Sequence, residues 1–263
     1  MSKKFDSLAI TLALLASTIL SAFGQAGSKP STIPESGKPA DQASATRILF
    51  IGNSFTYVND LPAMLTKLAQ AGGQKPLVCA RETPGGCSFE KHWKDGKALT
   101  AIQSRKWDYV VLQEVSKGPV TNKAGMFEYA RKLNEAISTQ GAKTLLYMTW
   151  AWPKPDSQPV ITSAYQELGR ELRAQVVPVG IAWDATLQAH PQIGLFGKDH
   201  HHPSPAGTYL AACAFYAVIY GCSPEGLPTT TLQDLKEADA RVLQKQANAA
   251  AQGNPADIPA NKP

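Results

Sequence analysis

The 263-residue sequence lacks a CxxC pair, a dense run of lysine and arginine, and a second long apolar segment after the one near its N-terminus. Its four cysteines therefore show no dithiol motif. The basic residues are scattered and do not alternate with aromatic residues, so nucleic acid is not an expected partner. No pairing of carboxylates is clear enough to indicate glycoside hydrolysis.

The cysteines at 79, 87, 213 and 222 are even in number, and four cysteines allow three disulfide connectivities. Cys79 falls in a predicted strand and Cys213 on the apolar side of a predicted helix, where a buried thiol is the favoured interpretation. A disulfide stays open, because the N-terminus predicts an oxidising compartment.

The N-terminus has the architecture of an export signal. Two early lysines precede an apolar run from Leu8 to Leu20, which is short for a bilayer, and small residues follow. We interpret residues 1–26 as a signal peptide, cleaved after Gly24 or Ala26, and expect a periplasmic or secreted protein with no stable membrane insertion afterwards. An uncleaved anchor is the alternative. Residues 27–45 are rich in Ser, Pro, Gly, Lys and Ala and predict a flexible linker.

The rest of the chain alternates apolar strands with amphipathic helices, which is typical of a parallel α/β sheet. At 43% hydrophobic residues it can bury one sizeable core. We therefore predict one domain, a three-layer α/β/α sandwich over residues 46–228 with a mostly parallel, flavodoxin-like sheet of about five strands. Residues 229–263 are predicted to be a helical appendage and tail. The predicted strands are Arg47–Gly52, Leu77–Ala80, Tyr109–Leu112, Thr144–Met148 and Val176–Val179. The predicted helices are one from Leu61 that stops at Gly72, Ala98–Arg105, Ala124–Thr139, Ile161–Ala174, one from Pro205 through Ala217, and one within Thr230–Gln252.

Functional residues of such sheets lie beyond the carboxyl ends of the strands, because right-handed crossovers bring those loops to one edge. The residues that follow the first four predicted strands there are Asn53 and Ser54, Gly85 and Gly86, Gln113 and Glu114, and Thr149 with Trp150 and Trp152.

A second group of polar residues precedes the predicted helix at Pro205. Asp199 and three histidines lead to Ser204, a natural N-cap, with proline at the first helical position. His202 then lies just outside a helix N-terminus, where the macrodipole disfavours protonation. This suits a histidine that begins as a free base.

Together these residues can carry out acyl transfer. A serine hydroxyl needs a base within hydrogen-bond reach, a carboxylate that orients the base, and donors for the oxyanion. Ser54 supplies the hydroxyl, His202 the base and Asp199 the carboxylate. Ser54 lies at one end of the predicted domain, and the other two lie at the opposite end.

The segment Ile48–Phe55, with the letters ILFIGNSF, resembles the first conserved block of the SGNH (GDSL-like) hydrolases, with Asn53 where the common form has aspartate. The segment from Asp199 to His202 resembles their last block. The resemblance implies a serine nucleophile at Ser54. It covers about residues 46–228.

The resemblance also implies an oxyanion hole made of the backbone N–H groups of Ser54 and Gly86 and a side-chain amide. The family usually has Gly-x-Asn-Asp after the third strand, whereas this chain has Gln113 and Glu114. A related branch of carbohydrate acetylesterases has a Gln-Gly-Glu pattern there, which makes Gln113 the candidate third donor.

The expected function is therefore hydrolysis of carboxylic esters through an acyl-enzyme, without a cofactor, on a small-molecule or carbohydrate ester. Two alternatives stay open, a non-catalytic cell-envelope binding module and an acyltransferase that uses the same serine. The oligomeric state is not predicted. The candidate substrate contacts are Asn53, Glu114, Trp150, Trp152 and His201.

Several other interpretations compete at individual residues. Three adjacent histidines suggest a metal, but neighbours in an extended segment point to opposite sides, so no metal site is predicted. His92 is a competing base or an ordinary hydrogen-bonded histidine, and Cys87 is an unfavoured thiolate nucleophile. For Trp150 and Trp152, core packing is an equal alternative to stacking on a sugar ring.

Overall fold

The computed structural model describes residues 45–152, 157–229 and 235–253. All described residues belong to one compact unit. The predicted signal peptide at 1–26, all of the predicted linker except residue 45, and the last ten residues lie outside the described part.

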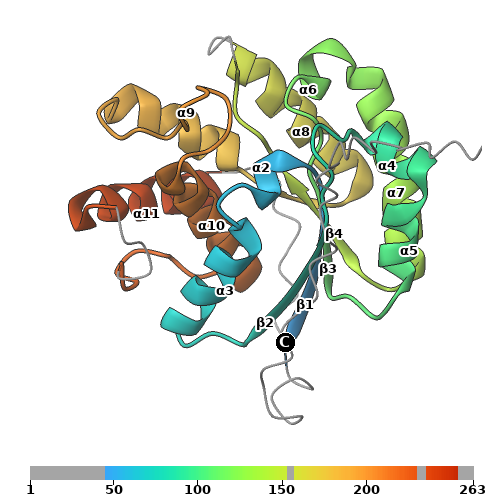
Figure 1. Ribbon diagram of the computed structural model, residues 1–263, viewed down its shortest axis with the longest axis horizontal. Coiled ribbons are helices and arrows are strands. Elements are labelled where there is room, and N and C mark those ends of the chain that lie inside the picture. The colour runs from blue at the N-terminus through green and yellow to red at the C-terminus, as the bar shows by residue number, and fades with distance from the viewer. Residues whose placement is uncertain (1–44, 153–156, 230–234, 254–263) are drawn as a thin grey trace, which may run out of the picture. The chain divides into compact units, whose positions relative to one another are not determined.

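The core of the fold is one five-stranded sheet in which every strand is parallel to its neighbours (Figure 1). The strand order is β2-β1-β3-β4-β5, so the order reverses between β1 and β3. In α/β sheets of this kind, ligands bind at that reversal, beyond the carboxyl ends of the strands. The strands are β1 (Thr46–Ile51), β2 (Leu77–Glu82), β3 (Tyr109–Leu112), β4 (Lys143–Tyr147) and β5 (Gln175–Val177). All five predicted strands are confirmed, and the expected mostly parallel sheet is wholly parallel.

Helices cover both faces of the sheet, which confirms the predicted three-layer α/β/α sandwich (Figure 1). One layer contains α3 (Leu61–Ala71), α9 (Val179–Ala189), α10 (Pro205–Tyr220) and α11 (Glu237–Gln252). The other contains α4 (Phe89–Asp95), α5 (Lys97–Gln103), α6 (Gly118–Thr121), α7 (Lys123–Thr139) and α8 (Gln158–Leu172). The one-turn helix α2 (Ser54–Tyr57) directly follows β1.

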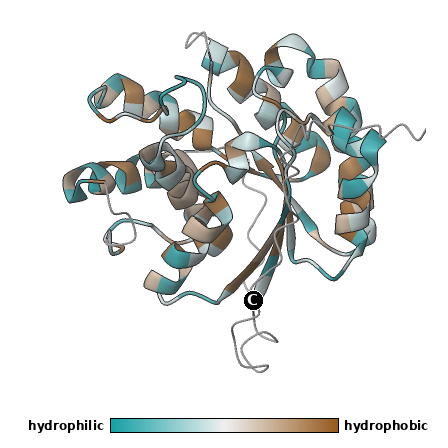
Figure 2. Ribbon diagram, in the orientation of Figure 1, coloured by the Kyte–Doolittle hydropathy of each residue, from teal (hydrophilic) through white to brown (hydrophobic). Residues whose placement is uncertain are grey.

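Strand β1 supplies side chains to both halves of the core. Ile48 and Phe50 belong to the apolar cluster under α3 and α10, whereas Leu49 and Ile51 belong to the cluster under α5 and α7. Successive side chains of a strand point to opposite faces, so a central strand that is covered on both faces must be apolar throughout. Figure 2 shows this apolar colouring along the sheet.

The C-terminal helix α11 is part of this core rather than the predicted appendage. Ala240, Leu243 and Ala247 are fully buried and lie in the same cluster as α10. The buried amide of Gln244 donates to the hydroxyl of Tyr209 at 2.7 Å, which ties α11 to α10. An alanine-rich stretch lacks the large apolar residues that mark a buried face, but its small side chains let two helices approach closely.

Four of the described helices were not predicted, namely the one-turn helices α2 and α6, and α4 and α9. Helix α4 is short and mostly charged, and α9 begins at Val179, which was assigned to the last strand. At Gly180, a Cβ atom would lie 2.1 Å from the backbone oxygen of Thr149. Only glycine allows α9 to approach the end of β4 this closely.

The four cysteines are free thiols in the structure. Cys213 is fully buried, as expected, and Cys79 is half-buried on β2. Within the described residues, no helix has both the length and the apolar character that crossing a membrane requires.

Candidate active site

Gly52 and Asn53 connect β1 to α2, and with Ser54, the predicted nucleophile, they are called the nucleophile loop. Asn53 caps α2, because its side-chain oxygen accepts the backbone N–H of Phe55 at 3.1 Å. Its amide nitrogen donates to the carbonyl of Cys87 at 3.0 Å, which joins this loop to the segment that follows Gly86. Asn53 is therefore a buried scaffold residue, not the predicted substrate contact. Ser54 follows as the first residue of α2 and is 8% exposed.

Gln113 is the main departure from the predicted site. Its side chain is fully buried, and its oxygen accepts both the backbone N–H of Asn53 at 2.9 Å and the hydroxyl of Thr56 at 3.0 Å. Its amide nitrogen donates to the carbonyl of Glu114 at 2.5 Å. The amide thus supports the nucleophile loop from behind, and in this arrangement it does not face the position of an oxyanion.

Glu114 lies behind the loops as well and is only 2% exposed. Its carboxylate accepts the backbone N–H groups of Val115 at 2.7 Å and Phe89 at 3.2 Å. Burial raises the pKa of this carboxyl to about 7, although the two N–H donors oppose the rise. The predicted contact with substrate is wrong for Glu114, because its carboxylate connects the start of α4 to the end of β3.

His92 is a buried structural histidine. Its ring is 2% exposed, and Nε2 lies 2.7 Å from the carbonyl oxygen of Gly52, to which it donates. Burial lowers the pKa of His92, so the ring is held neutral. This is the ordinary hydrogen-bonded role, and His92 does not compete with the base at Ser54.

The histidine loop from Phe196 to Ser204 folds back on itself ahead of α10. Phe196 pairs with Pro203 in an antiparallel bridge, and the backbone N–H of Gly197 donates to the carbonyl of His202 at 2.8 Å. Ser204 caps α10 by accepting the N–H of Gly207 at 3.1 Å. The predicted N-cap and the proline at the first helical position are confirmed. Both define where α10 begins, and they therefore hold the backbone of His202 in position at the edge of the sheet.

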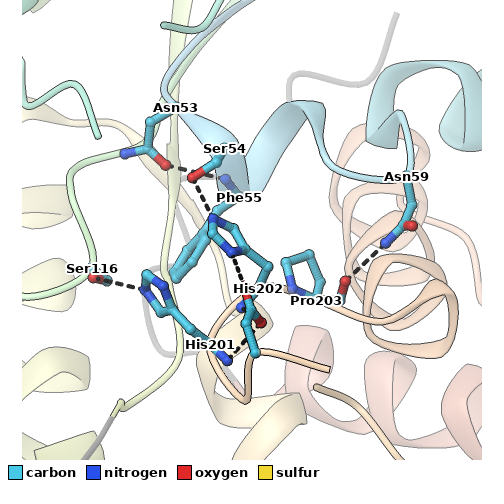
Figure 3. A network of polar contacts seen from close by, with 9 residues as sticks. Asn53, Ser54, Phe55, Asn59, Ser116, His201, His202 and Pro203 are labelled. Atoms are coloured by element: carbon cyan, nitrogen blue, oxygen red, sulfur yellow. Dashed lines mark hydrogen bonds and ion pairs between the residues drawn. The ribbon is translucent and has the colours of Figure 1, made fainter. Parts of the chain in front are cut away.

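Ser54, His202 and Asp199 form one hydrogen-bonded chain, and Figure 3 shows its contact between Ser54 and His202. The hydroxyl of Ser54 lies 2.8 Å from Nε2 of His202, and Nδ1 of His202 lies 2.5 Å from Oδ2 of Asp199. The other carboxylate oxygen accepts the backbone N–H groups of His201 and His202, each at 3.0 Å. The hydrogen bond from His202, and then these N–H donors, keep the pKa of Asp199 far below its ordinary value.

Two backbone N–H groups beside this chain have no acceptor among the described residues, those of Ser54 and Gly86. Gly86 has a φ of +62°, and open space surrounds the position where a Cβ would stand. Ser54 begins a helix, where the first N–H groups have no intrahelical partner. Free donors beside a nucleophile are what an oxyanion requires.

No protein-family model matches the sequence, and no curated protein does. Among solved structures, a protein assigned to the SGNH hydrolases from Slackia heliotrinireducens is 27% identical, with a TM-score of 0.59 over 66% of this chain and 99% of that one. The chain belongs to the SGNH hydrolase superfamily.

Solved structures with lower sequence identity to this chain share its fold. A DUF4886 family protein from Bacteroides uniformis is 17% identical, with a TM-score of 0.64 over 80% of this chain and 95% of that one. A mutant of an acetyl-xylooligosaccharide esterase from Geobacillus Stearmophilus is also 17% identical, with a TM-score of 0.56 over 71% and 98%.

The two predicted tryptophans of this SGNH hydrolase separate in the structure. Trp150 is fully buried and stacks between Phe55, at 4.2 Å between ring centroids, and Trp183, at 3.9 Å. It therefore belongs to the core. Trp152 is partly exposed, and its ring lies 4.0 Å from the ring of His201.

His201 lies between the catalytic chain and Trp152. Its ring centroid is 4.7 Å from that of His202, and its Nε2 lies 3.4 Å from the hydroxyl of Ser116 (Figure 3). Partial burial, and then the neighbouring His202 and Lys117, lower the pKa of His201. A neutral imidazole in this position can contact an uncharged substrate without competing for the proton of Ser54.

Asn59 is a site residue that the sequence did not reveal. Its amide nitrogen donates to the carbonyl of Pro203 at 2.9 Å and to the hydroxyl of Thr208 at 3.0 Å, so it connects the end of α2 to the histidine loop (Figure 3). Asn59 has a φ of +56°, a left-handed conformation that asparagine adopts more readily than most residues. An isolated asparagine after an unrecognised one-turn helix carries no sequence signal of this role.

The residues of this SGNH fold that the structure describes include no group of three histidine, cysteine or acidic side chains placed to hold a metal ion. His200 is exposed, with a φ of +53°, and points its backbone N–H at the carbonyl of Gly197. The three adjacent histidines thus have three different environments. His200 is exposed to solvent, His201 contacts the ring of Trp152, and His202 contacts the hydroxyl of Ser54.

Proposed function

We propose that this protein is a serine ester hydrolase that removes short acyl groups, acetyl foremost, from a carbohydrate. The observation that carries the proposal is the chain of hydrogen bonds from Ser54 through His202 to Asp199. The SGNH superfamily supports hydrolase chemistry.

The reaction begins when Ser54 attacks the ester carbonyl and its hydroxyl proton moves to Nε2 of His202. Asp199 accepts the Nδ1–H, which fixes the tautomer that leaves Nε2 free and stabilises the imidazolium that forms. His202 then gives the proton to the leaving alcohol. In the second half, water attacks the acyl carbon while the same base removes its proton. The bond between the acyl carbon and Ser54 then breaks, His202 returns the proton to the Ser54 oxygen, and the carboxylic acid leaves.

The oxyanion is held by the backbone N–H groups of Ser54 and Gly86 in this proposal. Each is a fixed donor, which does not need to reorganise during the reaction. Losing one donor of this kind costs roughly a hundredfold to a thousandfold in kcat. Gln113 contributes by holding the loop that carries Ser54, since its oxygen fixes Asn53 and Thr56.

Two features support a carbohydrate as the alcohol. Trp152 and His201 form a partly exposed aromatic surface beside the base, and flat aromatic faces pack well against sugar rings. The structural neighbours include proteins described as an acetyl xylan esterase and an acetyl-xylooligosaccharide esterase. Export, as the N-terminal sequence predicts, would bring the protein to such polymers outside the cell.

A fluorophosphonate probe tests the nucleophile directly. The wild-type protein should be labelled and should hydrolyse a short-chain aryl ester, and Ser54→Ala should lose both properties. Ser138→Ala, at an exposed serine of α7, is the matched control and should keep both. If the wild-type protein neither reacts with the probe nor hydrolyses any ester in a panel of aryl acetates, acetylated xylan, pectin fragments and peptidoglycan, the hydrolase function is wrong.

A further inference from the structure

A cavity of about 360 Å³ opens beside the histidine loop. Its wall includes Trp152, Trp183, Phe196 and His200, so it is largely aromatic. Trp152 links the cavity to the catalytic chain of Ser54, His202 and Asp199, because its ring centroid lies 4.0 Å from that of His201, whose ring centroid lies 4.7 Å from that of His202. The cavity therefore lies on the histidine side of the nucleophile. Its volume falls near the lower end of the range of small-molecule sites, roughly 300–1,000 Å³.

The direction of proton transfer indicates which part of an ester would lie there. The alcohol leaves by taking the proton from Nε2 of His202, so its oxygen must come within hydrogen-bond reach of that ring. The oxyanion faces the N–H groups of Ser54 and Gly86 instead. A group bound on the far side of His201 is therefore part of the alcohol, not the acyl group.

Trp183 supports the aromatic wall from behind. The residue is 1% exposed, and its ring stacks on Trp150 at 3.9 Å and meets Phe196 edge-on at 5.1 Å between centroids. Trp152 and Phe196 are the more exposed aromatic rings of the wall. Flat aromatic faces of this kind pack against the C–H groups of a sugar ring.

A second cavity, of about 390 Å³, continues from the first between α8 and α9. The two share Gln158 and Asp184 in their walls, and Asp184 is oriented by an N–H of Gln188 at 2.8 Å. Gln158 is held in place on both sides, since it accepts the backbone N–H of Ala151 at 2.8 Å and donates to Thr162 at 3.3 Å. The shared wall is therefore fixed and polar.

The chemistry of the wall changes from the first cavity to the second. The residues around the second are mainly amides, hydroxyls and one carboxylate, with Thr162, Ser163 and Gln166 on α8 facing Asp184 and Gln188 on α9. An alkyl chain would bury none of these groups favourably, because each would lose its hydrogen bonds to water. A second sugar ring can replace those hydrogen bonds.

We propose that these two cavities are consecutive alcohol subsites, so that the substrate is an acetylated oligosaccharide of at least two sugar units. The acetylated ring lies against Trp152 and Phe196, and the next ring lies between α8 and α9. This inference rests on the proposed function and adds to it the side of the site that binds the alcohol and the length that it recognises.

The test compares esters that share the acetyl group and differ in the alcohol. The substrates are p-nitrophenyl acetate and singly acetylated mono-, di- and trisaccharides built from xylose, glucose or N-acetylglucosamine. In at least one series, kcat/KM should rise tenfold or more from mono- to disaccharide. It should change little from di- to trisaccharide, because the two proposed subsites hold two rings.

Ser163→Trp, at an exposed position of α8 in the wall of the second cavity, should remove the gain for the disaccharide. The ratio of kcat/KM between disaccharide and monosaccharide should then fall below about twofold. Arg170→Trp, at an exposed position of the same helix that lines neither cavity, is the matched control and should keep the wild-type ratio.

The outcomes separate this inference from the function on which it rests. If the protein hydrolyses p-nitrophenyl acetate and acetylated monosaccharides but no series gains from a second ring, the subsites are wrong and the esterase stands. The same conclusion follows if Ser163→Trp and Arg170→Trp keep the same disaccharide gain. If no acetyl ester is hydrolysed at all, the proposed function fails first and the subsites fail with it.

Discussion

The side-chain oxygen of Gln113 accepts the backbone N–H of Asn53 at 2.9 Å, one residue before the nucleophile. The bond joins the end of β3 to the end of β1, at the reversal of strand order. Gly52 makes this approach possible, because a Cβ there would lie 2.6 Å from the same oxygen. The position of Ser54 thus depends on a buried amide that itself touches no substrate.

Gln113→Ala should therefore act mainly through stability. It leaves the N–H of Asn53 and the hydroxyl of Thr56 without a buried acceptor, and each such loss costs roughly 1–3 kcal/mol. We expect a lower free energy of unfolding in urea, with a loss of kcat that accompanies it. The measurement pairs urea unfolding with steady-state kinetics on an aryl acetate. Unchanged stability with a kcat reduced a hundredfold or more would restore Gln113 as an oxyanion donor.

Asp199→Asn tests the orientation of the base. Asparagine can accept from Nδ1 of His202 only if its amide is turned, and it brings no charge to the imidazolium, so kcat should fall roughly 10²- to 10⁴-fold. The fall in kcat should be near the lower end of this range, because the Asp199 side chain is 52% exposed and water can partly replace its hydrogen bond to His202. KM for an aryl acetate should change little.

The control for this variant is Asp95→Asn, at an exposed aspartate of α4. It should retain wild-type kcat. If Asp199→Asn is as active as this control, Asp199 does not orient His202, and the catalytic chain reduces to Ser54 and His202.

The sequence predicted the parts of the fold that depend on local patterns. The apolar runs of the five strands and the N-cap at Ser204 are local patterns, and the structure confirms them. Ser54 and His202 were selected from two separate contexts at opposite ends of the domain, and the folded chain places them 2.8 Å apart. Helix α9 was missed, because Gly180 serves a close approach to Thr149 that only the folded chain reveals.

The side-chain environments could not be predicted in the same way. Gln113, Glu114 and Trp150 stand at the end of strands, where exposure and burial are equally compatible with the sequence. Their burial depends on contacts with residues that are far apart in the chain, such as Asn53 and Phe89. A strand end therefore indicates where a site lies, but not which of its side chains face the substrate.

Asn59 offers a test of the contact between α2 and the histidine loop. Asn59→Gly keeps the left-handed backbone at φ +56° and removes the two hydrogen bonds to Pro203 and Thr208. We expect the free energy of unfolding to fall by about 1–2 kcal/mol. We also expect kcat to be several times lower, because the histidine loop no longer holds His202 firmly at its distance from Ser54.

The measurement for Asn59→Gly is thermal unfolding together with kcat, and Asn59→Asp is the companion variant. Aspartate also tolerates the left-handed conformation but cannot donate to a carbonyl oxygen, so it should lose at least as much activity as glycine. Full activity in both variants would show that the histidine loop keeps its position without Asn59.

Glu114 predicts a particular dependence of stability on pH. Burial raises its pKa to about 7 from 4.5, so the folded protein binds this proton more readily than the unfolded chain does. Stability from this group is therefore complete below about pH 4.5, decreases as the pH rises towards about 7, and is constant above that. The loss is on the order of 3 kcal/mol. The nearby charge of Glu90 acts in the same direction.

Glu114→Gln removes the titration and keeps one oxygen that can accept the N–H of Val115 or Phe89. The difference in free energy of unfolding between this variant and the wild-type protein should therefore shift in favour of the variant between about pH 4.5 and 7. Urea unfolding at several pH values measures the difference directly, and pH effects of the other groups cancel in it. A difference that does not vary with pH would mean that Glu114 keeps an ordinary pKa, and that its buried carboxylate is fully compensated by the two backbone N–H groups.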